Sequence, residues 1–457
     1  MQVQSTTKTA TKEIQEFRQQ YYACCKSWPD TLFELTDALL YQNGSAPSLP
    51  HLSLAPGFSR SHGSLYKGLS KGELDADRFR QLLVANRPRS WPEVYAIDSS
   101  TWMRSDAETS PERGFYYSAS HHSNGKPIVA GWSYSWITQL NGQPDSWTAP
   151  LDVERIPPKV TLTAATVAQI RRLCHQLPTT GSLPLFVLDA GYDPIALTSQ
   201  LSGEAVQLLV RLRSDRVFYG DPPERRPGPY GRPRRHGEKC DLGGDPTKLP
   251  APTHSLVDGD PRYGTVQVDA WTGLHAKLAH RGDWLSPGQT PIVKGTILRV
   301  QVEHLPKRHG GATNTLWLWW SGLENPDLAL LWRGYLRRFD IEHTFRFVKG
   351  PLHWTTPRVR TPEQADRWTA VVVAAYTQLR LAKTLVQDHR LPWEKPLTPA
   401  QLTPGRVLRG LSALRPQLGS PASVPKRHRA GPGRPRGTKR PPRIRYPAVK
   451  KTPWKDV

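Results

Sequence analysis

Two aspartates follow short apolar runs in the sequence. Asp98 follows the run 94–97 and Asp189 follows the run 185–188, and both runs are typical of buried strands. Carboxylates at the ends of neighbouring strands can lie close enough to share a divalent cation, which binds oxygen ligands. A lone aspartate at a strand end is more often a turn former or a helix cap. For the pair, a metal site and these structural roles explain the sequence equally well, so a third carboxylate has to decide between them.

A third group of residues lies on a helix that we predict over residues 328–350. Tyr335, Arg338, Glu342 and Lys349 stand three, four and seven residues apart, so they share one face of that helix. A carboxylate beside a guanidinium fork and a lysine point charge suits a site that holds both metal and phosphate. The alternative is an ordinary salt-bridged helix face, because Arg338 and Glu342 are an i,i+4 pair.

The charge balance makes clustered acids informative. The 457 residues include 62 Lys and Arg against 39 Asp and Glu, which gives a formal net charge of +23. Such a chain attracts polyanions and favours nucleic acid as its partner, although a ribosome-associated or simply basic protein has a similar balance. Acids repel DNA phosphate, so their clustering points to metals. Two Mg²⁺ ions roughly 3.5–4 Å apart can activate an attacking oxygen and stabilise a leaving one.

Other classes of protein fit the sequence poorly. The four cysteines have no C-x-x-C spacing, so they predict neither a zinc site nor a disulfide framework. The start of the chain is polar, and the longest apolar run, 370–376, is too short to span a membrane. We therefore expect a cytoplasmic protein that acts on a polyanion.

Apolar periodicity predicts an α/β fold in which helices partly cover both faces of a sheet. We expect strands at 94–98, 115–120, 127–137, 185–189, 205–212, 264–271, 297–303 and 315–320. We expect helices at 70–85, 163–177, 194–202, 328–350 and 362–386. Three consecutive strands thus precede an alternation of helix and strand.

Composition divides the chain into five segments. They are a helical N-terminal domain at 1–89, the first part of a core at 90–213, a β-rich insertion at 214–325, the second part of the core at 326–390, and a Pro-rich basic tail at 391–457. The N-terminal domain is either a compact helical module or a module that binds DNA ends. The tail is expected to be disordered without its partner.

The helix residues carry a family resemblance. Their pattern matches the YREK signature of bacterial insertion-sequence transposases of the DDE superfamily. The segments 97–100 and 189–193 resemble that family's two aspartate motifs, and the resemblance covers about residues 91–383. It implies an RNase H-like mixed-sheet catalytic core, interrupted by a β-rich insertion between the second aspartate and the glutamate.

The resemblance also implies roles for single residues. Asp98, Asp189 and Glu342 would be the catalytic metal ligands for Mg²⁺, or for Mn²⁺ in its place. Tyr335, Arg338 and Lys349 would bind DNA phosphates near the cleaved end. Asp193 is a rival for the second carboxylate. Asp189 is preferred because it directly follows the apolar strand, whereas Asp193 precedes Pro194 and is expected to cap the next helix.

The implied function is that of a DNA transposase. It would cleave element ends and join the 3′-OH to target DNA, with double-stranded DNA (terminal inverted repeats and target) as partner and as a homodimer on paired ends. Its place would be the bacterial cytoplasm, with the nucleoid. The alternatives are a structure-directed RNase H-like nuclease and a non-catalytic or inactivated DNA-binding or architectural protein.

Two further features suggest contacts with DNA. Tryptophans in the insertion could stack on a flipped base, although core positions explain any one of them as well. These candidates are Trp271, Trp284, Trp317, Trp319 and Trp320. In the tail, the segment 432–437 resembles the core of an AT-hook, in which Arg434 and Arg436 would enter a narrow minor groove. Non-specific phosphate contact is the simpler explanation of the same residues.

Overall fold

The chain forms two compact units, which are described separately below. The computed structural model describes residues 2–42, 48–118, 126–143, 145–178, 181–224, 234–280, 282–284, 288–305, 314–426, 435–439 and 442–449, without the side chains of 2–7. Unit 1 comprises Met1–Ser90, Ser99–Thr161 and Asp340–Val457, and unit 2 comprises Trp91–Asp98 and Leu162–Phe339. The fold is mixed α/β with a large mixed sheet, as the sequence predicts.

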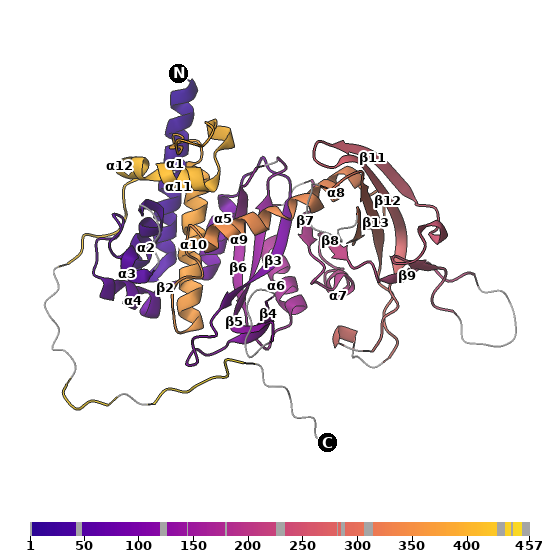
Figure 1. Cartoon of the computed structure of the whole chain (residues 1–457), viewed down its shortest axis with the longest axis horizontal. Helices are drawn as coiled ribbons and strands as arrows, with labels where there is room; N and C mark the ends of the chain where they lie inside the picture. Colours follow the sequence, from indigo (N-terminus) through magenta and orange to yellow (C-terminus); the bar gives the residue numbers. More distant parts are fainter. Residues whose placement is uncertain are drawn as a thin grey trace. The chain divides into compact units, whose positions relative to one another are not determined.

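Helices make up the N-terminal part of unit 1. They are α1 (Gln2–Cys24), α2 (Pro29–Tyr41), α3 (Leu49–Leu52), α4 (His62–Lys71) and α5 (Ala76–Ala85), with a small pair of strands, β1 (Cys25–Ser27) and β2 (Glu73–Leu74). The later helix α10 (Pro362–Ala382) lies beside α1 and α2 (Figure 1). The helix predicted over 70–85 is therefore wrong at its start. Gly72 ends α4, and Asp75 accepts a hydrogen bond from the backbone N–H of Arg78 to begin α5.

Arg18 joins the helices of unit 1 from a buried position. Its guanidinium donates to both carboxylate oxygens of Asp37 on α2 at 2.7 and 2.9 Å. It also donates to Gln378 on α10 and to the carbonyl of Gly419, each at 2.7 Å. Burial raises the pKa of the Asp37 carboxyl, against the opposing pull of Arg18. Loss of either charge would leave the other buried and unpaired, which would destabilise the packing of these helices.

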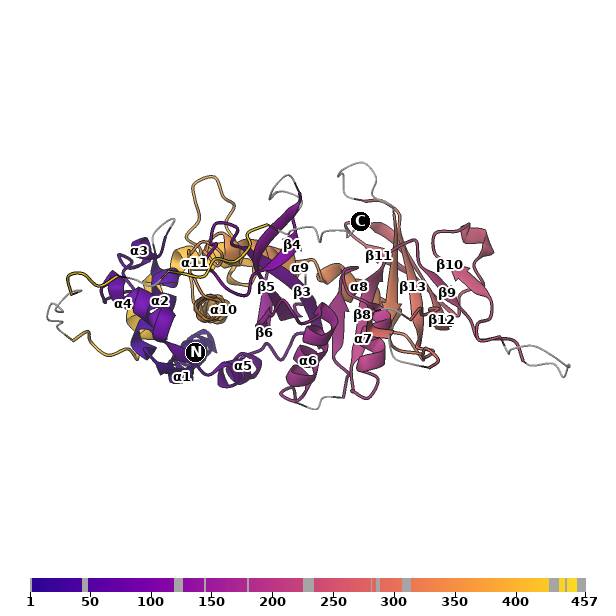
Figure 2. The same cartoon turned by 90° about the horizontal axis from the view of Figure 1, so that it is seen from below.

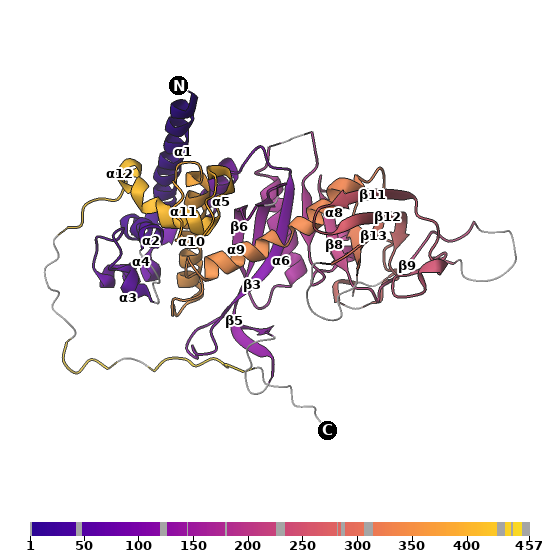
Figure 3. The same ribbon diagram turned by 45° about the horizontal axis from the view of Figure 1, so that its top comes forward.

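The strands of unit 1 are antiparallel. They are the second half of β3 (Val94–Met103), β4 (Gly114–Tyr117), β5 (Ile128–Leu140) and β6 (Thr148–Ile156). Strand β5 is central, because it pairs with β3, with β4 and with β6. The helix α9 (Asp340–Lys349) lies across β5 and β6 (Figure 3). Its contact with β5 is aromatic, because the centre of the Phe345 ring lies 5.6 Å from that of Trp136. Trp354, just after α9, lies 5.0 Å from the same Trp136 ring.

Strand β6 is absent from our sequence prediction. Its sequence carries Pro150, Asp152 and Glu154, which hide the apolar alternation of a strand. The structure accommodates Pro150 opposite Thr138, where the register with β5 shifts. Proline is tolerated at such an irregularity because a ladder hydrogen bond is already missing there.

Unit 2 contains a group of parallel strands. The first half of β3 pairs in parallel with β7 (Leu185–Leu188), and β7 pairs in parallel with β8 (Gln207–Leu212). Figure 2 shows α6 (Leu162–Cys174) and α7 (Pro194–Gln200) below these strands and α8 (Leu328–Arg337) above them. Of these elements, β7, β8, α6 and α7 match the strands and helices predicted for the middle of the core.

The β-rich insertion extends this sheet. Its strands are β9 (Val217–Tyr219), β10 (Lys239–Asp241), β11 (His254–Asp260), β12 (Gly264–His275), β13 (Lys294–Val302) and β14 (Thr315–Trp320). Strand β14 pairs antiparallel with β8, with Trp319 opposite Val210. The sheet then continues through β13 and β12, and β12 pairs with both β11 and β9. The insertion thus builds outward from β8.

The single helix predicted over 328–350 is wrong. The structure has two helices, α8 and α9, which are separated by Arg338 and Phe339. The last turn of α8 tightens, because the N–H of Arg338 donates to the carbonyl of Tyr335 three residues earlier. Asp340 then begins α9 with an acidic first turn, which suits the positive end of a helix. The helical spacing of the apolar residues continues through this break, so the sequence pattern alone predicts one uninterrupted helix.

The tail is more ordered than the sequence predicts. Short helices lie at Pro399–Gln401 (η3), Pro404–Gly410 (α11), Leu411–Leu414 (η4) and Arg415–Leu418 (α12), and Val407 and Leu411 are fully buried. Further on, the N–H of Tyr446 donates to the carbonyl of Glu108 at 2.7 Å, and Arg113 donates to the carbonyl of Tyr446 at 3.0 Å. The expectation of disorder is wrong for these described residues. None of the described helices has the length and apolar character of a membrane span.

Replacement of Arg18 by Met should destabilise unit 1 strongly. The substitution leaves Asp37 buried without its cation, and breaking a buried pair on one side costs about 3–5 kcal/mol. Urea denaturation of wild type and Arg18→Met, followed by circular dichroism, measures the difference.

Lys12→Met on the same helix is the matched control. Lys12 pairs with Glu16 at 3.7 Å, but their side chains are 76% and 56% exposed. Exposed pairs contribute less than about 1 kcal/mol, so this variant should stay close to wild type. Equal losses from both substitutions would contradict the special role of Arg18.

Two histidines of unit 2 form a hydrogen-bonded pair. His236 Nδ1 lies 2.8 Å from His275 Nε2, and His275 is fully buried. Burial lowers the pKa of both imidazoles, and the neighbouring cations Arg235, Lys277 and Lys294 lower it further, with Asp221 acting against them on His275. The folded protein therefore favours the neutral pair.

The stability of unit 2 should consequently fall in mild acid. A lowered folded-state pKa means that this stability is complete above the unfolded-state pKa of about 6.5 and is lost as the pH falls below it. Urea midpoints at pH 7.5 and 5.5 test this, with His236→Gln expected to reduce the difference and the exposed His254→Gln to leave it unchanged. An undiminished pH effect in His236→Gln would show that the pair is not its source.

Candidate functional site

The register of β3 against β7 brings two predicted site residues together. Ile97 is opposite Leu188 in this parallel pair, so Asp98 and Asp189 occupy the next positions at the same edge. Asp189 directly follows β7, as predicted. Asp98 does not end its strand, because β3 continues to Met103. Both aspartates are half-buried, and Asp189 Oδ1 accepts a hydrogen bond from the N–H of Gly191 at 2.8 Å.

Arg338 and Tyr335 belong to the same cluster. Arg338 Nη1 lies 3.3 Å from Asp98 Oδ2, in an ion pair whose side chains are only 12% and 17% exposed. The Arg338 guanidinium also lies 6.0 Å from the centre of the Tyr335 ring. Burial raises the pKa of Tyr335 against the effect of Arg338 and Arg211. Four predicted site residues thus lie together in unit 2: Asp98, Asp189, Tyr335 and Arg338. The positive charge of Arg338 offsets the negative charge of Asp98.

Tyr192 is a member of the cluster that sequence reasoning did not assign a role. Its side chain is buried, and burial, with further contributions from Asp98 and Asp189, raises its pKa well above the usual value. Its hydroxyl has no hydrogen-bond partner among the residues that the structure describes. The available signal was its place in the segment 189–193, which resembles the family's second aspartate motif.

Arg211 is a second residue that sequence reasoning missed. Leu188 is opposite Val210 in the parallel pair of β7 and β8, so Arg211 takes the position beside Asp189. Its side chain is exposed, and its charge lowers the pKa of Tyr335. The signal that could have found it is a lone arginine at the carboxyl edge of the third parallel strand. The edge therefore carries two acids and at least two cations.

The rival carboxylate Asp193 has a structural role. Its Oδ1 accepts hydrogen bonds from the backbone N–H groups of Ile195 and Ala196 at 3.0 and 3.2 Å. Pro194 occupies the first helical position of α7, which suits its fixed φ. The prediction that Asp193 caps this helix is confirmed.

Glu342 and Lys349 lie on α9 in unit 1. Glu342 is in the first turn and is half-buried, while Ile341, Phe345 and Val348 form the buried face of the helix. Lys349 Nζ lies about 6 Å from the centres of the Phe345 and Trp354 rings. Within the described part of each unit, no three His, Cys, Asp or Glu side chains are arranged to hold a metal ion. The full triad stays a prediction.

The insertion tryptophans are mainly core residues. Trp271, Trp317, Trp319 and Trp320 are all buried. The first three belong to one hydrophobic cluster, and Trp320 is opposite Leu209 of β8. Three of the indole N–H groups have internal acceptors: Pro250 for Trp271, Thr198 for Trp319 and Gln207 for Trp320. Trp284, which is only partly buried, keeps the base-stacking hypothesis open.

Of the two arginines predicted to contact DNA from the tail, the structure describes only Arg436. Arg434 lies outside the described residues, whereas Arg436 is exposed in a turn that Gly437 completes with a φ of +82°. The hydroxyl of Thr438 donates to the carbonyl of Pro435 at 2.8 Å and closes this turn. The AT-hook interpretation and the simpler phosphate-contact interpretation both remain predictions.

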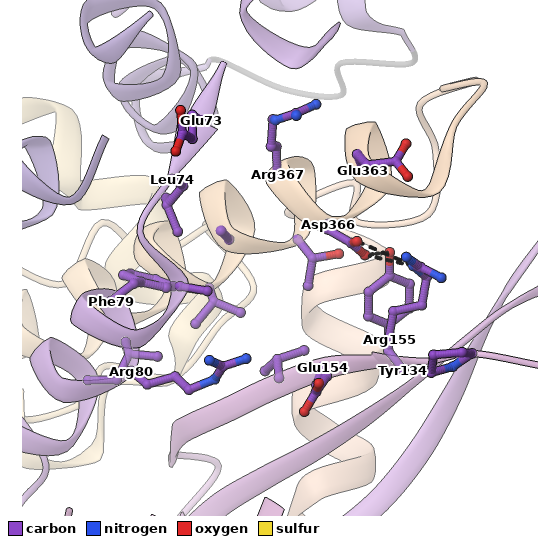
Figure 4. Close-up of a pocket in the computed structure, with 17 residues that line it drawn as sticks. Glu73, Leu74, Phe79, Arg80, Tyr134, Glu154, Arg155, Glu363, Asp366 and Arg367 are labelled. Carbon is purple, nitrogen blue, oxygen red and sulfur yellow. Dashed lines mark hydrogen bonds and ion pairs between the residues drawn. The ribbon is translucent and has the colours of Figure 1, made fainter. Parts of the chain in front are cut away.

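A cavity of about 420 Å³ lies elsewhere in unit 1, between α5, β6 and α10 (Figure 4). Its polar lining includes Tyr134, Arg155 and Asp366. The Tyr134 hydroxyl and the Arg155 guanidinium both donate to Asp366, at 2.8 and 3.1 Å. These groups satisfy one another, and no residue predicted for the metal and phosphate site lines the cavity. The size of this cavity therefore does not identify it as the reactive site.

One comparison with known proteins gives a match. The sequence model of a family described as DDE superfamily endonuclease matches residues 20–277. The match includes Asp98 and Asp189 and ends before Tyr335 and the helix that follows it. No curated protein matches the chain.

The ion pair between Asp98 and Arg338 should be energetically coupled. A double-mutant cycle with Asp98→Asn and Arg338→Ala, measured by urea denaturation, should give a coupling energy of about 1–3 kcal/mol because both side chains are largely buried.

The pair Asp258–Arg333 is a control on the same helix α8. It has a shorter contact of 2.7 Å, but the Arg333 side chain is 57% exposed. Solvent screening should keep its coupling below about 1 kcal/mol. A larger coupling for this exposed pair than for Asp98–Arg338 would refute the prediction.

Proposed function

The chain belongs to the DDE superfamily of endonucleases, and on this premise we propose that it is a DNA transposase. In this proposal it cleaves the ends of a mobile element and joins the freed 3′-OH to target DNA. Asp98, Asp189 and Glu342 are the catalytic carboxylates. A nuclease of this superfamily acts on DNA, and the net charge of +23 suits a polyanionic substrate.

One observation carries the proposal. The parallel register sets Asp98 and Asp189 at adjacent positions, with Arg338 paired to Asp98. Carboxylates repel DNA phosphate, so in a basic DNA-cleaving protein they need a function that outweighs this cost. Holding divalent cations against a phosphodiester is such a function.

The strand arrangement gives further support. Strands β3, β7 and β8 are parallel, while β5 and β6 form an antiparallel pair next to the second half of β3. This mixed order agrees with an RNase H-like core that begins with consecutive strands and continues through alternating helices and strands. The long insertion follows β8 and precedes α8, between the second aspartate and the glutamate.

The donor chemistry at the edge fits Mg²⁺. Asp98 and Asp189 supply hard oxygen ligands, and Glu342 would add a third. Three residues after Asp189, the buried hydroxyl of Tyr192 lacks a partner among the described residues and is a further polar atom of this segment. When bound, Mg²⁺ would lower the pKa of an attacking water and offset charge on the leaving oxygen.

The surrounding cations would position the DNA. Arg338 can grip a phosphate with its planar fork, Tyr335 and Lys349 can add single contacts, and Arg211 extends the cationic edge across β8. Arg338 has a double role here. Its ion pair balances Asp98 in the free protein, and its transfer to a DNA phosphate would release that carboxylate for metal binding.

The proposal includes the state of assembly. Transposition requires two element ends held together, so a homodimer on paired DNA ends is expected. The helical N-terminal domain and the basic tail would contact the terminal inverted repeats and flanking DNA.

Cleavage of DNA that carries the inverted repeats flanking this gene tests the function. Wild type should cut at the repeat ends in Mg²⁺. Asp189→Asn and Glu342→Gln should each lower the cleavage rate at least about a hundredfold, because each removes an anionic metal ligand. Both variants should still bind the same DNA in a gel-shift assay.

Asp193→Asn is the matched control, four residues from Asp189. Asparagine caps a helix as well as aspartate does, so this variant should retain both stability and cleavage. Loss of cleavage in Asp193→Asn alone would reassign the second carboxylate. Binding without cleavage by wild type would favour the architectural alternative, and cleavage of branched DNA without regard to the repeats would favour the structure-directed nuclease.

A further inference from the structure

Tyr192 has a buried hydroxyl in an unusual setting. Its side chain is 5% exposed, and the hydroxyl has no hydrogen-bond partner in the described part of the chain. A buried hydroxyl without a partner costs free energy, which phenylalanine at this position would avoid. If this side chain served packing alone, phenylalanine would serve as well, so packing does not explain the hydroxyl.

The charges that act on this hydroxyl include those of the two predicted metal ligands. Asp98, Asp189 and Arg338 are the charged groups that act on the Tyr192 phenol. Asp189 stands three residues before Tyr192 in the same tight segment, and one of its oxygens, Oδ1, is held by the N–H of Gly191 at 2.8 Å. A phenol hydroxyl can donate a hydrogen bond to a carboxylate oxygen.

We propose that Tyr192 is a positioning residue, whose hydroxyl donates to the carboxylate of Asp189 when that carboxylate binds a divalent cation. With Gly191 on the other side, Asp189 would then be oriented by two donors from its own segment. Carboxylate ligands commonly have such hydrogen-bonding partners, which fix their direction. This inference rests on the proposed function, because it takes Asp189 as a metal ligand.

The free protein and the metal-bound protein would use different partners at this edge. In the free protein Arg338 pairs with Asp98 at 3.3 Å, while the N–H of Gly191 donates to Asp189 Oδ1. Asp98 and Asp189 would hold the divalent cation, whose charge would offset the repulsion between their carboxylates. The orphaned hydroxyl of Tyr192 is the nearby donor that can then complete the hydrogen bonding of Asp189. The hydrogen bond to Asp189 would then satisfy the hydroxyl, which has no partner among the described residues of the free protein.

Mn²⁺ binding to the full chain tests this role. Free Mn²⁺ is measured by electron paramagnetic resonance during titration with MnCl₂, and thermal unfolding is recorded with and without the ion. Tyr192→Phe should be at least as stable as wild type without metal, because it loses an unpaired hydroxyl. Its affinity for Mn²⁺ should fall about tenfold, as for the loss of other partners of metal ligands.

Tyr95→Phe is the matched control. Tyr95 is also a buried tyrosine of unit 2, but its hydroxyl donates to Glu93. This variant should lose stability without metal and keep the Mn²⁺ affinity of wild type. Opposite responses of the two tyrosines would separate positioning of a ligand from simple packing.

The outcomes distinguish this inference from the function on which it rests. If Asp189→Asn loses Mn²⁺ binding while Tyr192→Phe binds like wild type, the metal site stands and the role of Tyr192 is wrong. A loss of stability in Tyr192→Phe without any change in Mn²⁺ affinity would overturn the role in the same way. If wild type itself binds no Mn²⁺, the metal assignment of Asp98 and Asp189 fails, and this inference fails with it.

Discussion

The parallel pairing of β3 with β7 is the constraint on which the candidate site depends. Because Ile97 is opposite Leu188, the aspartates that follow them meet at one edge, and the pairing of β7 with β8 adds Arg211 beside them. Side chains alternate between the faces of a sheet, so a slip of one residue would send one aspartate to the other face. The fully buried apolar run of β7 prevents that slip. The packing of apolar side chains in β7 thereby fixes the positions of Asp98 and Asp189, which themselves contribute little to the hydrophobic core.

Electrostatics at this edge is a balance between groups of opposite sign. The chain is strongly basic, yet two half-buried aspartates lie side by side at this edge. Arg338 neutralises Asp98 in the free protein, and the same guanidinium is suited to bind phosphate. Such an exchange of partners would couple DNA binding to the release of a metal ligand. The buried pair Arg18–Asp37 contrasts with it, because its guanidinium is surrounded by fixed partners in the helices of unit 1.

The two units share the elements that carry the predicted site residues. Strand β3 contributes Val94–Asp98 to unit 2 and its remainder to unit 1. The predicted YREK helix is likewise divided, since α8 with Tyr335 belongs to unit 2 and α9 with Glu342 and Lys349 belongs to unit 1. The tight turn at Arg338 places this residue with the aspartates of unit 2. A signature that is regular in sequence thus corresponds to two helices with different packing partners.

The sequence by itself determined the local features of this protein. The apolar runs before Asp98 and Asp189, the cap at Asp193 and the class of fold all follow from side-chain patterns within a few residues. Tertiary structure alone decided which strands pair, how β6 accommodates Pro150, where the long helix breaks, and that the insertion tryptophans are mostly core. It also buried the Tyr192 hydroxyl, which has no hydrogen-bond partner among the described residues. These outcomes depend on contacts between residues far apart in the chain, and local periodicity carries no record of such contacts.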